Sequence, residues 1–248
     1  MSIISNINLK VLLLDTDFYA LQAINSYLAW DRRTRVTFMA ETEDAMWDYL
    51  GQTAQAELPD VVVLDADHMG GETGLVTTID RLKSKIISVR IVCLAQFVNA
   101  DLVKAAAERG AAAYLLKQET RMMIAWAIVH TLERDFVITQ GVARECSHVF
   151  HSRIFKAAIL PERRHYPELT DRIRQAIKLC VVEGMPAHLA ADEMGISLNT
   201  IRSYIKEGYR ILESYDETEY PVEMTPQERA FMRFTALADE DDTSVPES

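Results

Sequence analysis

The sequence offers little for covalent cross-linking or for membrane insertion. Its 248 residues include three cysteines, Cys93, Cys146 and Cys180, which are odd in number and far apart. Such cysteines exclude a disulfide framework and indicate buried thiols in a reducing compartment. No apolar run approaches the roughly 18 residues of a membrane span, and the amino terminus lacks the basic start and apolar stretch of a secretory signal. We therefore expect a cytoplasmic protein without a membrane partner.

Catalytic motifs are also lacking. The sequence has no nucleophile elbow, no zinc-ligand spacing and no glycine-rich loop followed by Lys-Ser or Lys-Thr. Cys146, His148 and His151 have no fourth ligand nearby, so packing or surface positions explain them better than a metal site does. We expect no enzymatic activity and no certain cofactor.

Positive charge is scarce overall, but the deficit is local. The chain has 26 Lys and Arg against 37 Asp and Glu, a net charge of −11. Residues 216–248 alone contain ten acidic and two basic residues, so most of the excess lies there. The acidity therefore does not exclude a nucleic-acid partner for the residues before 216.

Two architectures follow one another along the chain. Between Leu9 and Glu133, five short apolar runs alternate with five amphipathic segments, a pattern typical of parallel strands that helices cover on both faces. We predict a doubly wound, flavodoxin-like α/β domain over residues 1–135, with a five-stranded parallel sheet. The expected strands are Leu9–Leu14, Val36–Ala40, Val61–Leu64, Ile91–Leu94 and Ala113–Leu116. The expected helices are Tyr19–Trp30, Glu43–Leu50, Leu75–Leu82, Asp101–Arg109 and Thr120–Glu133.

Beyond this domain the pattern is helical. We predict a helical linker over residues 136–166, an all-α helix-turn-helix domain over 167–215, and a carboxyl-terminal extension over 216–248. Thr170 and Ser197 are expected to cap two helices of the helix-turn-helix domain. The extension has one helix, indicated by the capping sequence Thr225–Glu228, and an acidic tail, Asp239–Ser248, that we expect to be disordered.

Charged side chains gather at the ends of the predicted strands. Asp15 and Asp17 follow the first strand, Asp65 and Asp67 the third, and Lys117 the fifth. In doubly wound folds the functional site lies at the carboxyl ends of the strands. Clustered carboxylates can bind Mg2+, with Asp15, Asp65 and Asp67 as candidate ligands, and an aspartate beside that ion can accept a phosphoryl group. The simpler alternative is that polar loop residues begin wherever a sheet ends.

These residues resemble the receiver domain of two-component response regulators. The resemblance lies in Lys10–Asp17 (KVLLLDTD), Pro59–Asp65 (PDVVVLD) and Tyr114–Lys117 (YLLK). It implies that Asp65 is the phosphoacceptor, that Asp15 is an acid of the Mg2+ site, and that Lys117 is the cation on the phosphate side. It also implies a histidine kinase as a partner.

The sequence departs from the receiver pattern at two of the site positions. Thr16 stands where the family usually has a second acid, and Asp17 is the one nearby acid that could replace it. Ala95 stands where the family has a serine or threonine, so the hydroxyl that would bond a phosphoryl oxygen is missing. We therefore predict an atypical, degenerate receiver that acts in dimerisation or partner binding and is independent of phosphorylation.

The second unit resembles the LuxR/NarL-type helix-turn-helix, whose pattern Gly184–Lys206 (GMPAHLAADEMGISLNTIRSYIK) follows without gaps. The candidate DNA contacts on its last helix are Asn199, Thr200, Arg202, Ser203, Lys206 and Arg210. The resemblance implies that Arg202, Ser203 and Lys206 lie in the major groove of double-stranded DNA and that the first two residues of the set bond phosphates. The alternative is a solvated helix surface that carries three cations.

These features together predict a DNA-binding transcriptional regulator that works as a homodimer on paired half-sites. Two other functions remain open from the sequence. The chain could be an adaptor whose receiver and extension bind RNA polymerase or a sigma factor. It could also be a conventional response regulator that phosphorylation switches.

Overall fold

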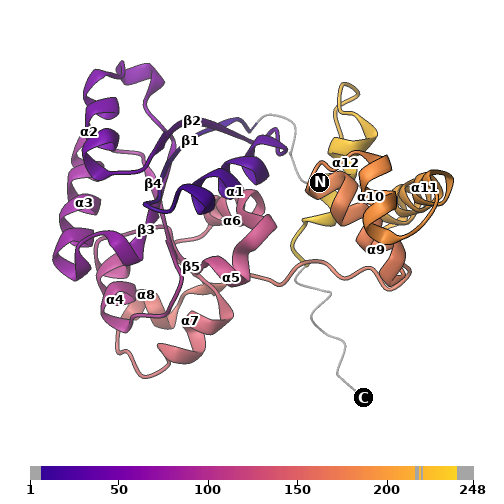
Figure 1. Ribbon diagram of the computed structural model, residues 1–248. Coiled ribbons are helices and arrows are strands. Elements are labelled where there is room, and N and C mark those ends of the chain that lie inside the picture. Colours follow the sequence, from indigo (N-terminus) through magenta and orange to yellow (C-terminus); the bar gives the residue numbers. More distant parts are fainter. Residues whose placement is uncertain (1–6, 216–217, 219, 239–248) are drawn as a thin grey trace. The chain divides into compact units, whose positions relative to one another are not determined.

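Two units make up the part of the chain that the computed structural model describes, residues 7–215, 218 and 220–238 (Figure 1). One unit consists of residues 7–161 and is α/β, and the other begins at Glu162 and is mainly helical. The tail Asp239–Ser248, predicted to be disordered, lies outside the described residues. Among the described helices, none combines the length and the apolar character needed to cross a membrane.

A parallel sheet of seven strands is the centre of the α/β unit. Its strand order is β2-β1-β3-β4-β5-β6-β7. Helices α1 and α6 lie on one face of the sheet, and α2, α3 and α4 lie on the other (Figure 1). The strands are β1 (Leu9–Leu14), β2 (Thr34–Ala40), β3 (Val61–Asp65), β4 (Arg90–Ala95), β5 (Ala113–Leu116), β6 (Val137–Ile138) and β7 (Ala158–Ile159). The helices are α1 (Phe18–Ala29), α2 (Glu43–Gln52), α3 (Gly71–Lys85), α4 (Ala100–Glu108), α5 (Lys117–Thr120), α6 (Ile124–His130), α7 (Gln140–Glu145) and α8 (Ser152–Phe155).

The apolar runs of the sequence are the central strands. Every residue of β3 and of β5 is buried, because helices cover both faces of the sheet. The predicted doubly wound α/β arrangement is therefore confirmed, and the five predicted strands overlap β1 to β5 to within two residues at each end.

The predicted number of five strands is wrong, because the sheet continues beyond β5. Strand β6 pairs with β5 and β7 pairs with β6, both in parallel. They belong to residues 136–161, which the sequence analysis assigned to a linker and which the structure joins to the α/β unit. The side chains that this segment adds to the core are Phe136, Ile138, Val142, Cys146 and Ile154. Strands of two residues are too short to show a periodic pattern, so the apolar side chains of this segment gave no strand signal.

One ion pair of the α/β unit is buried completely. Arg33 Nη2 lies 2.7 Å from Asp31 Oδ2, and Arg33 Nε donates to Asp31 Oδ1 at 3.0 Å. The side chains are 2% and 0% exposed. The Arg33 guanidinium also lies 3.8 Å from the ring centroid of Trp126 in α6. The pair therefore ties the loop before β2 to α6.

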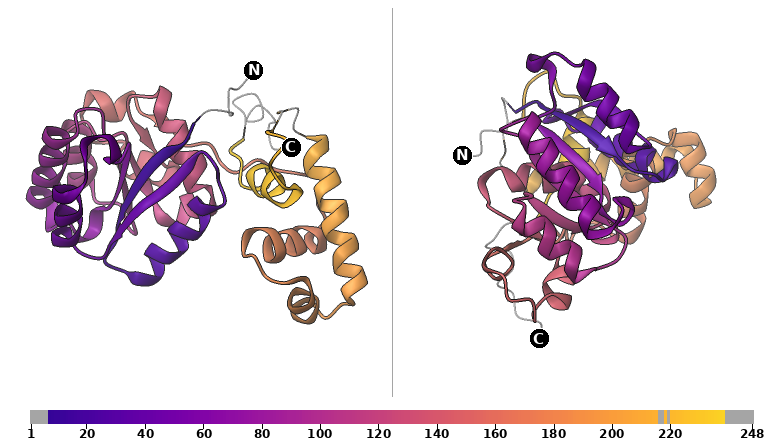
Figure 2. Two further views of the ribbon diagram at one scale, coloured as in Figure 1. Left: turned by 90° about the horizontal axis from the view of Figure 1, so that it is seen from above. Right: turned by 90° about the vertical axis from the view of Figure 1, so that its left-hand side faces the viewer.

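The described residues of the second unit form the α-helices α9 (Asp171–Ile177), α10 (Ala187–Met194), α11 (Leu198–Ser214) and α12 (Pro226–Phe234). Helix α9 continues as a wider π-helical turn over Lys178–Val182. The long helix α11, drawn in orange, runs alongside α9, α10 and α12 (Figure 2). Helix α12 is held to this unit by Gln227, whose Nε2 donates to Cys180 O at 3.1 Å.

The helix caps expected from the sequence are present. Ser197 Oγ accepts a hydrogen bond from the backbone N–H of Thr200, and Thr170 caps α9 in the same way. Thr225 and Glu228 form a complete capping box at the start of α12. Each cap satisfies a backbone N–H group that the first helical turn leaves without a partner. The helix boundaries of this unit therefore follow from local sequence.

Helices α11 and α9 approach most closely at Gly208. A Cβ atom added there would lie 2.6 Å from Ile177 Cδ1 and 3.2 Å from Ile173 Cγ2. We predict that Gly208→Val destabilises the helical unit by about 1–3 kcal/mol, because the added methyl groups overpack this contact. Calorimetric unfolding measures the loss, and Ser203→Val on the exposed side of α11 is the control, with a change within about 0.5 kcal/mol. A Gly208→Val protein as stable as wild type would contradict the close packing.

Candidate functional site

Three of the predicted receiver residues meet at the carboxyl-terminal edge of the sheet. Asp15 follows β1, Asp65 ends β3 and Lys117 follows β5. Lys117 Nζ lies 2.8 Å from Asp15 Oδ2 and 3.2 Å from Asp65 Oδ1. Parallel strands end at the same edge, which explains why residues so far apart in sequence come together. The sheet thus places one ammonium group between two carboxylates. Asp15, Asp65 and Lys117 are called the acidic cluster below.

Burial controls the electrostatics of this cluster. The two aspartates are each 2% exposed. Burial raises the pKa of Asp15 above its usual range, against the opposing effect of the hydrogen bond from Lys117. Burial would lower the pKa of Lys117, but the hydrogen bond to Asp15 and the charge of Asp65 outweigh it and raise that pKa. Lys117 is therefore held as a cation by the two acids that it separates.

A histidine that the sequence analysis did not single out completes the contacts of Asp65. His68 Nδ1 lies 2.7 Å from Asp65 Oδ2, at hydrogen-bond distance, while the other carboxylate oxygen faces Lys117. The turn that carries His68 packs tightly on α3, because a Cβ on Gly74 would lie 1.7 Å from Met69 O. The position of a histidine three residues after the candidate phosphoacceptor is the signal that could have identified it.

The other predicted receiver residues are not gathered at Asp65. Asp17 caps α1, where its Oδ1 accepts hydrogen bonds from the backbone N–H groups of Tyr19 and Ala20. It therefore does not replace the acidic residue that the receiver family usually has at the position of Thr16. Asp67 Oδ2 accepts from the backbone N–H of Gln96 at 2.5 Å. Ala95 is fully buried at the end of β4 and supplies no hydroxyl. Thr16 is exposed.

The candidate Mg2+ ligands are engaged by groups of the protein itself. Within the described part of the chain, no three His, Cys, Asp or Glu side chains are placed to hold a metal. The space between Asp15 and Asp65 is taken by Lys117 Nζ, and the candidate ligand Asp67 is bound to a backbone N–H instead. A Mg2+ ion needs several oxygen ligands around it, and here a cation of the protein neutralises the carboxylates. All three predicted metal ligands thus have partners within the protein, and their binding of Mg2+ stays a prediction.

The predicted DNA contacts form one face of α11. Asn199, Arg202, Ser203 and Lys206 are all exposed, at the i, i+3, i+4, i+7 spacing of a single helix face. The opposite face buries Ile201 together with later residues of the helix. The short turn between α10 and α11 includes Gly195, whose φ is 64°. The structure thus presents an amide, a guanidinium, a hydroxyl and an ammonium on one open helical surface.

Two members of the predicted set make contacts within the protein. Thr200 is half-buried, and its Oγ1 lies 2.8 Å from Ser197 Oγ. Arg210 is exposed but forms a two-point ion pair with Glu207, at 2.6 and 3.0 Å. Arg202 and Lys206 form no ion pair within the described residues, which leaves both charges available to an external partner.

Comparison with known proteins identifies the α/β unit. Residues 11–128 match the family model of the response regulator receiver domain. This range contains the acidic cluster and ends before β6, so the segment that carries β6 and β7 lies outside the match.

Relatives cover most of the chain. The nitrate/nitrite response regulator protein NarL of Escherichia coli K12 is 27% identical over 184 residues, which are 73% of this chain and 79% of NarL. The response regulator protein VraR of Staphylococcus epidermidis is 26% identical over 215 residues, 85% of this chain and 93% of VraR. Among solved structures, the RcsB response regulator of Salmonella typhimurium is 19% identical, with 88% of this chain and 96% of RcsB covered and a TM-score of 0.49.

Proposed function

Because the chain is a response regulator of the LuxR/NarL type, we propose that it is a DNA-binding transcriptional regulator that works as a dimer and does not need phosphorylation. Its relatives are regulatory proteins, not enzymes, in keeping with the absence of catalytic motifs from the sequence. The proposal has two parts, one for each unit.

The exposed face of α11 is the observation that carries DNA binding. A helix that enters the major groove needs an apolar face against its own domain and hydrogen-bonding side chains on the other. Arg202 and Lys206 can reach guanine O6 and N7, and Ser203 and Asn199 can bond base edges or phosphates. These four side chains are exposed together in α11, and Ile201, Ile211 and Leu212 of the same helix are buried.

Charge argues for a dimer. Residues 161–215 contain eight basic and eight acidic residues, and two of the acidic ones, Asp192 and Glu193, are exposed on α10. A neutral module gains little affinity from the release of counterions, so one copy is expected to bind DNA weakly. Two copies on paired half-sites would supply the missing affinity.

Footprinting with the purified full-length chain tests DNA binding. Selection from a random DNA library should recover a site, and the protected region should contain two half-sites about one helical turn, or 10 base pairs, apart. Recovery of no site would refute the proposal and favour an adaptor that binds RNA polymerase or a sigma factor.

Independence from phosphorylation rests on the acidic cluster. Asp65 faces Lys117 with one oxygen and His68 with the other, and Ala95 lacks the hydroxyl that would bond a phosphoryl oxygen. Transfer of a phosphoryl group needs a metal ion to neutralise the transferring oxygens, and the candidate Mg2+ ligands Asp15, Asp65 and Asp67 are each bonded within the protein. We therefore assign this cluster a structural role.

Asp65→Asn should leave DNA binding unchanged. We expect the variant to bind DNA with an affinity within about twofold of wild type. Addition of the phosphoryl mimic beryllofluoride should change neither affinity, because a mimic that does not favour the DNA-binding conformation cannot shift the protein toward it. Electrophoretic mobility shifts on the selected site measure this. A rise in wild-type affinity with the mimic that Asp65→Asn abolishes would show a conventional switch, controlled by a histidine kinase.

A further inference from the structure

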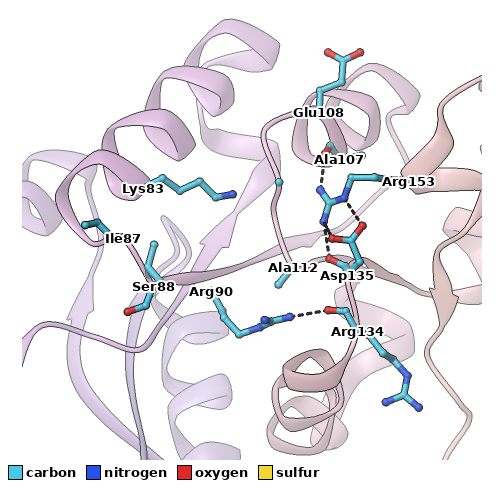
Figure 3. A pocket seen from close by; sticks show the side chains of 12 residues that line it. Lys83, Ile87, Ser88, Arg90, Ala107, Glu108, Ala112, Arg134, Asp135 and Arg153 are labelled. Atoms are coloured by element: carbon cyan, nitrogen blue, oxygen red, sulfur yellow. Dashed lines mark hydrogen bonds and ion pairs between the residues drawn. The ribbon is translucent and has the colours of Figure 1, made fainter.

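A second charged site lies at the opposite edge of the sheet from the acidic cluster. It is a pocket of about 440 Å³ at the amino-terminal ends of the strands, between the end of α3 and the start of β4 (Figure 3). The lining residues that carry the argument are Lys83, Arg90, Gly110, Asp135 and Arg153. None of them belongs to the acidic cluster or to the exposed face of α11.

Arg153 forms a fixed wall of this pocket. Its Nε donates to Asp135 Oδ2 at 2.7 Å, and its Nη2 donates to Asp135 Oδ1 at 3.0 Å. Its Nη1 donates to Ala107 O at 2.5 Å, and its Nη2 also donates to Ala111 O at 3.0 Å. These contacts hold the guanidinium in one orientation and neutralise the Asp135 carboxylate.

Lys83 enters the pocket without a direct ion pair, although the charges of Asp80 and Asp135 act on it from further away. Its Nζ forms no hydrogen bond or ion pair with the described residues. A Cβ on Gly110 would lie 2.4 Å from Lys83 Nζ and 3.9 Å from Arg153 Nη1, so the two cations border the same space. Burial lowers the pKa of Lys83, and the charge of Arg153 lowers it further. An ammonium group in this position would be stabilised by an anion.

Arg90 has donor capacity left over. Its Nη2 donates to the carbonyl oxygens of Thr131 and Arg134, the second at 2.8 Å, whereas its buried Nε has no hydrogen-bond partner. The Glu108 carboxylate points away from the centre of the pocket (Figure 3). The centre therefore holds three cations and one carboxylate, in a chain whose net charge is −11.

We propose that this pocket binds a phosphate-bearing small molecule, with Lys83 and Arg90 as its contacts. Guanidinium and ammonium groups that converge on one space suit a phosphate group with several acceptor oxygens. The volume falls within the roughly 300–1,000 Å³ of small-molecule sites, so it can hold more than one phosphate group. Lys83 and Arg90 lie within the receiver-family match, whereas Asp135 and Arg153 lie beyond residue 128, so the pocket is completed by the segment that follows the match.

Calorimetric titration of the full-length chain, in the presence of EDTA, tests the proposal with pyrophosphate and with ATP as probes. We expect at least one probe to bind with a Kd below about 1 mM. Lys83→Met should weaken that binding about tenfold or more, because it removes a charge-assisted contact. Lys85→Met, which removes an exposed charge of the same helix outside the pocket, should stay within about twofold.

The two probes separate the possible sources of the phosphate. Tighter binding of ATP would indicate a nucleotide or a similar organic phosphate, and equal binding would indicate inorganic polyphosphate. Failure of both probes to bind, or an equal loss in Lys83→Met and Lys85→Met, would overturn the proposal. Circular dichroism of each variant establishes that the fold is unchanged.

Discussion

Replacing Arg202 and Lys206 together by alanine should remove the footprint on the selected DNA site. Both side chains are exposed on α11 and neither is engaged in an ion pair within the described chain. A base contact of this kind is worth about 1–3 kcal/mol, so each substitution should cost about 5- to 150-fold in affinity. Footprinting and mobility shifts at one fixed salt concentration measure the loss.

Two matched variants show whether the loss comes from the α11 face. Lys178→Ala removes another exposed cation, from the π-helical turn after α9, where it pairs with Glu183, and should change affinity little. Arg210→Ala should have an intermediate effect, because Glu207 already holds this guanidinium. If all three proteins lose affinity equally, the face of α11 does not read the DNA.

Arg33→Met should destabilise the α/β unit more than any surface substitution. The change leaves the Asp31 carboxylate, which is 0% exposed, without its charged partner. Removing one member of a buried ion pair typically costs about 3–5 kcal/mol. All three tryptophans, Trp30, Trp47 and Trp126, lie in this unit, so urea unfolding followed by tryptophan fluorescence reports on it selectively.

The double variant separates the pair from its packing. Asp31→Asn combined with Arg33→Met leaves no charge buried and should recover much of the loss. Arg35→Met, at an exposed position of β2, is the control and should lie within about 0.5 kcal/mol of wild type. An Arg33→Met protein as stable as this control would contradict a structural role for the pair.

Local pattern made the central fold predictable. Continuous apolar runs such as Val61–Leu64 can be buried only between two helical layers, and caps such as Ser197 satisfy their own helix. The meeting of Asp15, Asp65 and Lys117 followed from the parallel order of the strands. These features depend on a few neighbouring residues or on a general rule of the fold.

Features that depend on side-chain geometry were not predictable. The contact of His68 with Asp65 requires the conformation of a short turn, and the insertion of Lys117 Nζ between the two carboxylates requires the side-chain conformations of all three residues. The pocket around Lys83 is closed by Arg153, 70 residues further along the chain, from a segment that shows no periodic pattern. Sequence alone carries no local signal for such contacts.

The additional strands decide how the first unit can be studied in isolation. A fragment cut at residue 128, where the receiver match ends, would keep the pairing of β5 with β4 but would leave the other edge of β5, which pairs with β6, without a partner. An open apolar strand edge of that kind invites association between molecules. A fragment of this unit should therefore end at Pro161. The edge strand is then β7, whose two residues are too few to pair stably with a strand of another molecule.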